Sequence, residues 1–206
     1  MQKLVSFIQL SLDGYLADAN GGISWAKAIQ DAECQAFVEQ NASGEGLLLF
    51  GRITYEMMAS YWPSPLAQKN DPVVAVSMNS RPKIVFSKTL ARALWSNTRL
   101  VKGDLAAEIR KLKKEDGKGM AILGSGNIVS QLAEERLIDE FQIVLNPVAL
   151  GNGRSIFAGI RKNLTLLPTS RPVVTSGLPT PPGLVAMVGP VTSPHQLQVA
   201  SRATPV

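Results

Sequence analysis

The sequence predicts an α/β protein with a central, mostly parallel mixed sheet flanked by helices. Short apolar runs alternate with amphipathic helical patterns along most of the chain, which is typical of parallel strands joined by crossover helices. The clearest unit has an apolar run at residues 120–123, the turn Gly124-Ser125-Gly126, a helical pattern at 127–136 and another apolar run at 137–145. Such a turn lets a phosphate approach the backbone at a helix N-terminus, although glycines also join strands to helices for steric reasons alone.

The composition fits one medium-sized globular domain. The chain has 206 residues, of which 45% are apolar and 18% charged, enough for one substantial core. No apolar run approaches the roughly 20 residues that span a bilayer, and no secretory leader precedes the first strand pattern. We therefore expect a cytoplasmic protein that does not bind membranes. With one cysteine, Cys34, and one histidine, His195, an internal disulfide is excluded, and we expect neither a metal centre nor a His-dependent triad.

The net charge of +5 and the isoelectric point near 9.5 raise the question of an acidic partner. The densest basic run, at residues 110–114, falls in the last turns of a predicted helix, where cations complement the helix dipole. We interpret it as a solvated helix end, and we expect no nucleic-acid binding because no recognised nucleic-acid motif accompanies it. A positive cleft that attracts an anionic cofactor is the preferred use of the charge.

Apolar runs place the strands. Residues 3–12 are almost continuously apolar and predict a central strand, and residues 47–50 predict a second buried strand. Between them, the segment 13–25 is rich in Gly, Asn and Asp, which predicts a mobile loop that covers a site. Further strands are expected at 83–86 and 99–101.

Four helices are expected before the glycine turn. Asp31 is a predicted N-cap for a helix with an apolar face of Cys34, Phe37 and Val38. Cys34 is therefore interpreted as a core residue. A second helix follows residue 51, with Ile53, Met57 and Tyr61 on one face, and ends at 61–65. Helices are also expected at 72–78 and 104–114.

Three predicted strand ends carry small, hydroxyl or cationic residues. These are Gly51, Arg52 and Thr54 after one strand, Ser87 and Lys88 after the next, and Gly124, Ser125, Gly126 and Asn127 after the third. Ligands of open α/β sheets bind outside the carboxyl ends of the strands, and these groups suit a multiply phosphorylated cofactor. Each residue alone has an ordinary alternative role in a turn, a helix start or the surface. Their coincidence at three strand ends favours the binding interpretation.

Several short motifs resemble the dihydrofolate reductase superfamily. The closer resemblance is to the branch of the C-terminal reductase domain of the bifunctional riboflavin-biosynthesis deaminase/reductase. It covers roughly residues 3–167 and is carried, in order, by residues 11–15, 51–55, 85–90, 123–126 and 146–153. The resemblance implies a single-domain dihydrofolate reductase-like fold and a homodimer.

The resemblance also implies NADPH as cofactor and hydride transfer to a small heterocycle, pteridine- or pyrimidine-like, as in dihydrofolate reductases or phosphoribosylaminouracil reductases. By matched position, Arg52 and Thr54 would meet the cofactor phosphates, Ser87 and Lys88 the adenosine 2′-phosphate, and residues 124–127 the pyrophosphate. Asp13 would face the substrate or orient a proton donor, and a turn aspartate before Gly14 is its alternative role. An NADP(H)-binding protein without turnover is the alternative function.

Two features depart from that branch. Gly124 stands where the riboflavin-pathway reductases usually carry a glutamate, which leaves the substrate open. The second departure is a proline-rich C-terminus. We expect a reductase core at 1–167, degenerate strands at 168–191, including short ones at 173–174 and 184–188, and a disordered tail at 192–206.

Overall fold

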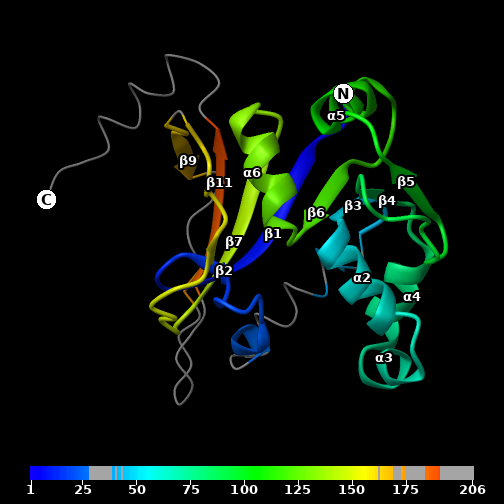
Figure 1. The fold of residues 1–206 in the computed structure, drawn as a ribbon, viewed down its shortest axis with the longest axis horizontal. Coiled ribbons are helices and arrows are strands. Elements are labelled where there is room, and N and C mark those ends of the chain that lie inside the picture. The colour runs from blue at the N-terminus through cyan, green and yellow to red at the C-terminus, as the bar shows by residue number, and fades with distance from the viewer. Residues whose placement is uncertain are drawn as a thin grey trace, which may run out of the picture.

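A computed structural model describes residues 1–27, 39, 41–42, 44–161, 163–168, 173–174 and 184–190. They form a nine-stranded sheet in the order β10-β11-β7-β1-β6-β3-β4-β5, with β9 paired to β11 (Figure 1). The predicted fold class, an α/β protein with a mostly parallel mixed sheet, is confirmed. No helix of the described residues is long and apolar enough to cross a membrane.

Six consecutive strands of the sheet run parallel. They are β1 (Leu4–Ser11), β3 (Leu47–Gly51), β4 (Lys83–Phe86), β5 (Thr98–Val101), β6 (Met120–Leu123) and β7 (Glu140–Asn146). β1 lies between β6 and β7, so the prediction of a central first strand is confirmed. The carboxyl ends of β4, β3 and β6 are neighbours at one edge, because these strands are adjacent and parallel.

Helices cover both faces of the sheet. The helices are α2 (Arg52–Tyr61), α3 (Pro65–Asn70), α4 (Pro72–Ser80), α5 (Leu105–Lys114) and α6 (Gly126–Glu134). Along β3, Leu49 belongs to the core with α5 and α6, whereas Leu48 and Phe50 belong to the core with α2 and α4. This alternation follows from the two-residue period of a strand. Figure 1 shows α6 crossing in front of β1.

The helix after β3 differs from the prediction in two ways. Its expected apolar face points outward: Ile53 is 63% and Met57 41% exposed, while Tyr55 packs in the core. The chain also forms α3, which the sequence analysis did not anticipate. The hydroxyl of Ser64 caps α3 by accepting the N–H of Ala67 at 3.2 Å, and Pro65 occupies its first turn. Proline is favourable there because the first helical N–H groups need no acceptor within the helix.

The basic run at the end of α5 is not wholly solvated, so that prediction is wrong for Lys113. This side chain is buried, and its ammonium donates to the carbonyl of Leu137 at 3.1 Å and to the carboxylate of Asp139. The same carboxylate accepts the N–H of Leu4 at 2.7 Å. Lys113 therefore ties α5 to the segment before β7.

The proline-rich C-terminal region contains regular strands. β11 (Leu184–Pro190) pairs antiparallel with β7, with β9 (Leu166–Pro168) and with β10 (Val173–Val174). The helix expected from Asp31, with Cys34, Phe37 and Val38, and the tail at 192–206 lie outside the described residues.

Candidate functional site

The glycine turn, Gly124-Ser125-Gly126, connects β6 to α6 in a left-handed conformation. Gly124 has φ 60°, and Ser125 has φ 56° and ψ 54°. A left-handed residue followed by the helical Gly126 makes successive backbone N–H groups converge, an arrangement that attracts anions. Within the described chain, no hydrogen bond uses the N–H of Gly126 or Asn127. The turn therefore offers free donors at a helix N-terminus.

Ser125 joins this turn to the neighbouring strand end. Its Oγ accepts the N–H of Gly51 at 3.0 Å, and Gly51 is the N-cap of α2. A Cβ built on Gly124 would lie 3.7 Å from Cγ2 of Thr54. The structure thus brings four of the predicted site residues, Gly51, Thr54, Gly124 and Ser125, into one cluster.

The N-termini of α2 and α6 are left open to a ligand. Neither has a side-chain cap or an acidic residue in its first turn. In contrast, the carboxylate of Asp104 caps α5 by accepting the N–H of Ala107 at 2.6 Å, and Glu108 lies in the same first turn. The start of a helix attracts negative charge. The carboxylates of α5 supply that charge from its own sequence, whereas the first turns of α2 and α6 carry no acidic residue.

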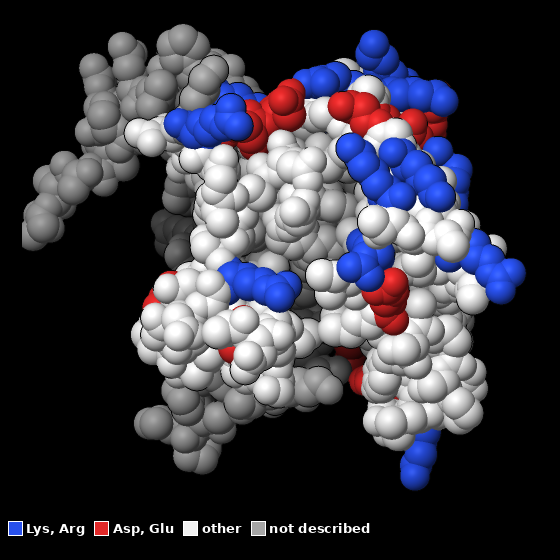
Figure 2. Space-filling view, viewed as in Figure 1, with Lys and Arg blue, Asp and Glu red and all other residues white. Residues whose placement is uncertain are grey.

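The predicted cations lie beside this cluster. Arg52 is exposed and forms an ion pair with Glu56 at 3.0 Å. Lys88 is exposed in the loop after β4, and the Oγ of Ser87 accepts the N–H groups of Thr89 and Leu90 at 3.2 and 3.0 Å. No hydrogen bond of the described residues joins Ser87 or Lys88 to the glycine turn. Figure 2 shows most Lys and Arg side chains of this face over α5 and β5, with only isolated ones flanking its centre.

Asp13 is held by the loop after β7. Its carboxylate accepts the N–H of Gly151 at 2.7 Å, the N–H of Leu150 at 3.0 Å and the hydroxyl of Ser11 at 2.6 Å. The Ser11 hydrogen bond, with those two N–H groups, lowers the pKa of Asp13 against the opposing effect of desolvation. An acid held ionised in this way suits positioning better than proton donation. Its direct role in catalysis stays a prediction.

A short ribbon covers the glycine turn from the Asp13 side. β2 (Tyr15–Ala17) pairs with β8 (Arg154–Ser155), and Leu16 packs so closely on Gly126 that a Cβ there would lie 2.5 Å from its Cδ2. Gly126 is therefore required for this contact, as Gly124 is for its positive φ. The loop at 13–25, expected as a cover, contains this strand and the start of a 3-10 helix, Ser24–Lys27. The sequence reasoning missed Leu16, since a three-residue strand carries no periodic signal.

Substitution of Gly126 by alanine tests this contact. We expect Gly126→Ala to displace Leu16 and to lower the melting temperature by a few degrees, about 1 kcal/mol, because the added methyl overpacks the turn. Leu16→Ala in the same chain should restore part of the loss, since it removes the clashing atoms. Thermal denaturation of the two single variants and the double variant measures the coupling. Strictly additive losses would contradict it.

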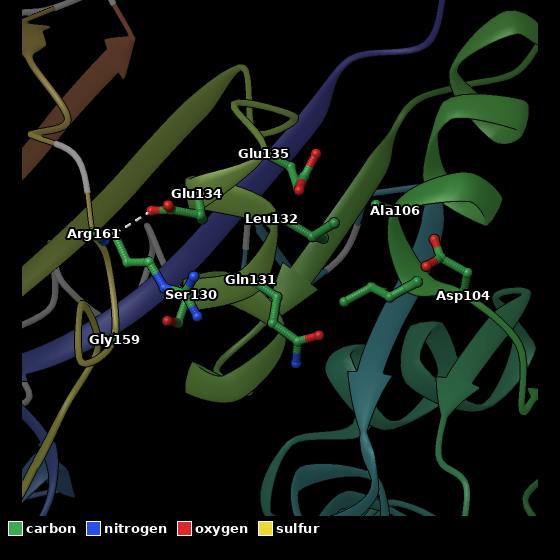
Figure 3. Close-up of a pocket in the computed structure, with 10 residues that line it drawn as sticks. Asp104, Ala106, Ser130, Gln131, Leu132, Glu134, Glu135, Gly159 and Arg161 are labelled. Atoms are coloured by element: carbon green, nitrogen blue, oxygen red, sulfur yellow. Dashed lines mark hydrogen bonds between the residues drawn. The ribbon is translucent and has the colours of Figure 1, made fainter.

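A hollow of about 450 Å³ lies beside the middle and the end of α6. It lies between α6, the start of α5 and the segment around Arg161, whose N–H donates to Glu134 at 3.1 Å (Figure 3). Gln131 lines the hollow, and its Nε2 donates to the side-chain oxygen of Asn127. Because its lining on α6 begins at Ser130, the hollow does not reach the glycine turn. A second hollow, of about 440 Å³, lies at the opposite, amino ends of β4 and β5.

The chain is similar in sequence to two uncharacterized proteins of Bacillus subtilis (strain 168). The chain is 23% identical over 177 residues to the uncharacterized protein YyaP of Bacillus subtilis (strain 168), covering 86% of this chain and 92% of YyaP. It is 29% identical over 159 residues to the uncharacterized protein YwjB of the same organism, covering 76% of this chain and 83% of YwjB.

Two solved structures share the reductase-like fold. A provisionally assigned riboflavin biosynthesis protein from Shewanella sp. PV-4 aligns with a TM-score of 0.70 and 25% identity, covering 93% of this chain and 99% of that one. The diaminohydroxyphosphoribosylaminopyrimidine deaminase/5-amino-6-(5-phosphoribosylamino)uracil reductase from Thermotoga maritima aligns with a TM-score of 0.59 and 16% identity, covering 92% of this chain and 57% of that one. The second likeness concerns the fold alone.

The family assignment comes from the sequence as a whole. Residues 2–173 match the family described as the RibD C-terminal domain, which spans the parallel sheet, the glycine turn and the Asp13 loop. The chain belongs to the RibD C-terminal domain family.

Proposed function

We propose that the protein is an NADPH-dependent reductase that transfers hydride to a small pteridine- or pyrimidine-like heterocycle. The observation that carries the proposal is the pair of open helix N-termini, α2 and α6, joined by the Ser125–Gly51 hydrogen bond at adjacent strand ends. Family membership supports a reductase, and the description of the Shewanella protein supports a substrate of the riboflavin type.

The residues of the cluster fit a dinucleotide phosphate. The N–H groups of Gly126 and Asn127 would hold pyrophosphate oxygens, with Thr54 beside them. Arg52 and Lys88 are exposed cations at the two neighbouring strand ends. Arg52 would meet the cofactor phosphates, and Lys88 the 2′-phosphate that distinguishes NADPH from NADH.

When bound, NADPH supplies the hydride, so the protein needs mainly to position two reactants and keep water away. Leu16 packs over the glycine turn and would form an apolar wall of the site. Asp13 fixes the loop at Leu150 and Gly151, and through it the β2–β8 ribbon. Its lowered pKa keeps this carboxylate ionised at neutral pH.

The ionised state of the Asp13 carboxylate also favours the second candidate function, NADP(H) binding without turnover. The one acid nominated for proton transfer is engaged by three donors. Such a protein would be stabilised by NADPH but would oxidise it with none of the pteridines or pyrimidines offered. A steady-state assay of NADPH oxidation with these compounds separates the two functions.

Thermal titration with NADPH and NADH tests the cofactor site. We expect NADPH to raise the melting temperature more than NADH at equal concentration, because a bound ligand stabilises by RT ln(1 + [L]/Kd). Arg52→Ala and Lys88→Ala should each weaken NADPH binding about tenfold, since each removes a phosphate contact. Lys88→Ala should leave NADH binding nearly unchanged, because NADH lacks the 2′-phosphate. Lys118→Ala is the matched control, because Lys118 precedes β6 at the opposite edge of the sheet. No stabilisation by either dinucleotide would refute the proposed function.

A further inference from the structure

Ser125 has a backbone conformation that serine does not favour. Three non-glycine residues of the described chain have positive φ: Asn97, Ser125 and Arg136. Asn97 belongs to a residue type that tolerates this region. Arg136 follows α6 and forms the usual left-handed helix end, where its N–H donates to Ala133 and the N–H of Leu137 donates to Leu132. Ser125 has neither explanation, since it lies before a helix.

Glycine would adopt the same conformation without strain, and glycines already flank Ser125 on both sides. What serine adds is its hydroxyl. This group is buried, Ser125 being 8% exposed, and it accepts the N–H of Gly51 at 3.0 Å. Strain that persists at one residue of a candidate site points to a requirement for that side chain.

We propose that Ser125 is a positioning residue that fixes the start of α2 against the start of α6, so that both helix N-termini bind the same anion. This inference rests on the proposed function. The hydroxyl hydrogen has only a long contact, 3.4 Å, to the carbonyl of Leu123, beyond the usual range for such bonds. It is therefore also available to a phosphate oxygen held between the two helices.

A pair of variants separates positioning from a merely structural role. Ser125→Ala removes the hydroxyl and keeps the strain, whereas Ser125→Gly removes both. We expect each to raise the Kd for NADPH about tenfold, while the melting temperature of Ser125→Gly without ligand stays equal to or above that of the wild type. Ser60→Ala, a change on the exposed side of α2, should leave both quantities unchanged. A wild-type Kd in Ser125→Gly, or a lower melting temperature with unchanged affinity, overturns the proposal.

Hydrogen exchange tests the bridge without any cofactor. The amide of Gly51 should exchange slowly in the ligand-free wild type and markedly faster in both variants, because its acceptor is lost. If the wild type fails to bind NADPH, the proposed function fails, and the exchange measurement still decides whether Ser125 holds the two helix starts together. Exchange at Gly51 that is the same in all three proteins refutes the bridge.

Discussion

Replacement of Lys83 by methionine should lower the free energy of unfolding by about 2 kcal/mol. Lys83 is 1% exposed, and its ammonium donates to the carbonyls of Met78 at 2.8 Å, Arg81 at 2.7 Å and Asn79 at 3.2 Å. It also lies 4.5 Å from the centre of the Trp95 ring. Methionine preserves the apolar stem but leaves carbonyls at the end of α4 without this donor. Urea denaturation measures the change in the free energy of unfolding. In thermal denaturation the same change should lower the melting temperature by about 4–8 °C.

Lys118→Met is the matched control, since Lys118 and its partner Glu45 are exposed and an exposed ion pair contributes little to stability. Burial, followed by the charge of Arg81, lowers the pKa of Lys83 from 10.5 to about 8. Between these values the unfolded chain binds more protons than the folded one. The stability of the wild type should therefore rise with pH relative to Lys83→Met. If Lys83→Met proves more stable than the wild type at pH 7, desolvation of the ammonium outweighs its hydrogen bonds.

Asp13→Ala should reduce kcat/KM for the heterocyclic substrate about 100-fold, because small misplacements of a reaction site have effects of this size. The substitution leaves the N–H groups of Leu150 and Gly151 and the hydroxyl of Ser11 without their common acceptor. The β2–β8 ribbon would then lose its anchor. NADPH oxidation with the pteridine or pyrimidine that the wild type reduces provides the measurement.

Asp13→Asn distinguishes positioning from proton donation. It retains one acceptor oxygen, so positioning predicts an intermediate loss and partly protected amides at Leu150 and Gly151. Unchanged turnover in Asp13→Asn would exclude proton donation by this residue. Because the folded pKa lies below the ordinary 3.8, the anchoring is complete above that pH and disappears as the pH falls through the lower folded value.

The sequence was sufficient for the parallel sheet and for the position of the glycine turn, because both depend on local apolar periodicity. It was insufficient wherever a contact joins distant parts of the chain. The carboxylate of Asp13 binds a loop 137 residues away, and Leu16 meets Gly126 through the fold alone. No local pattern records such contacts.

Charged residues and prolines behave differently from the predictions at specific positions. Lys113 lies in a run of basic residues, yet its side chain is buried and its ammonium donates to the carbonyl of Leu137, in the segment that precedes β7. The prolines at 63 and 65 suggested only a helix end. Pro65 instead begins α3, because Ser64 caps it. The predicted apolar face of α2 is its exposed side, and Tyr55 and Met58, rather than Ile53 and Met57, meet the core.

The pairing of β11 with β7 has a consequence for synthesis of the chain. β7 ends at Asn146, but its antiparallel neighbour begins only at Leu184. Until that later strand leaves the ribosome, one side of the apolar β7 presents unpaired backbone groups to other nascent chains. Release of residues 184–190 is therefore the step that closes this aggregation-prone edge, and truncation before it should yield insoluble protein.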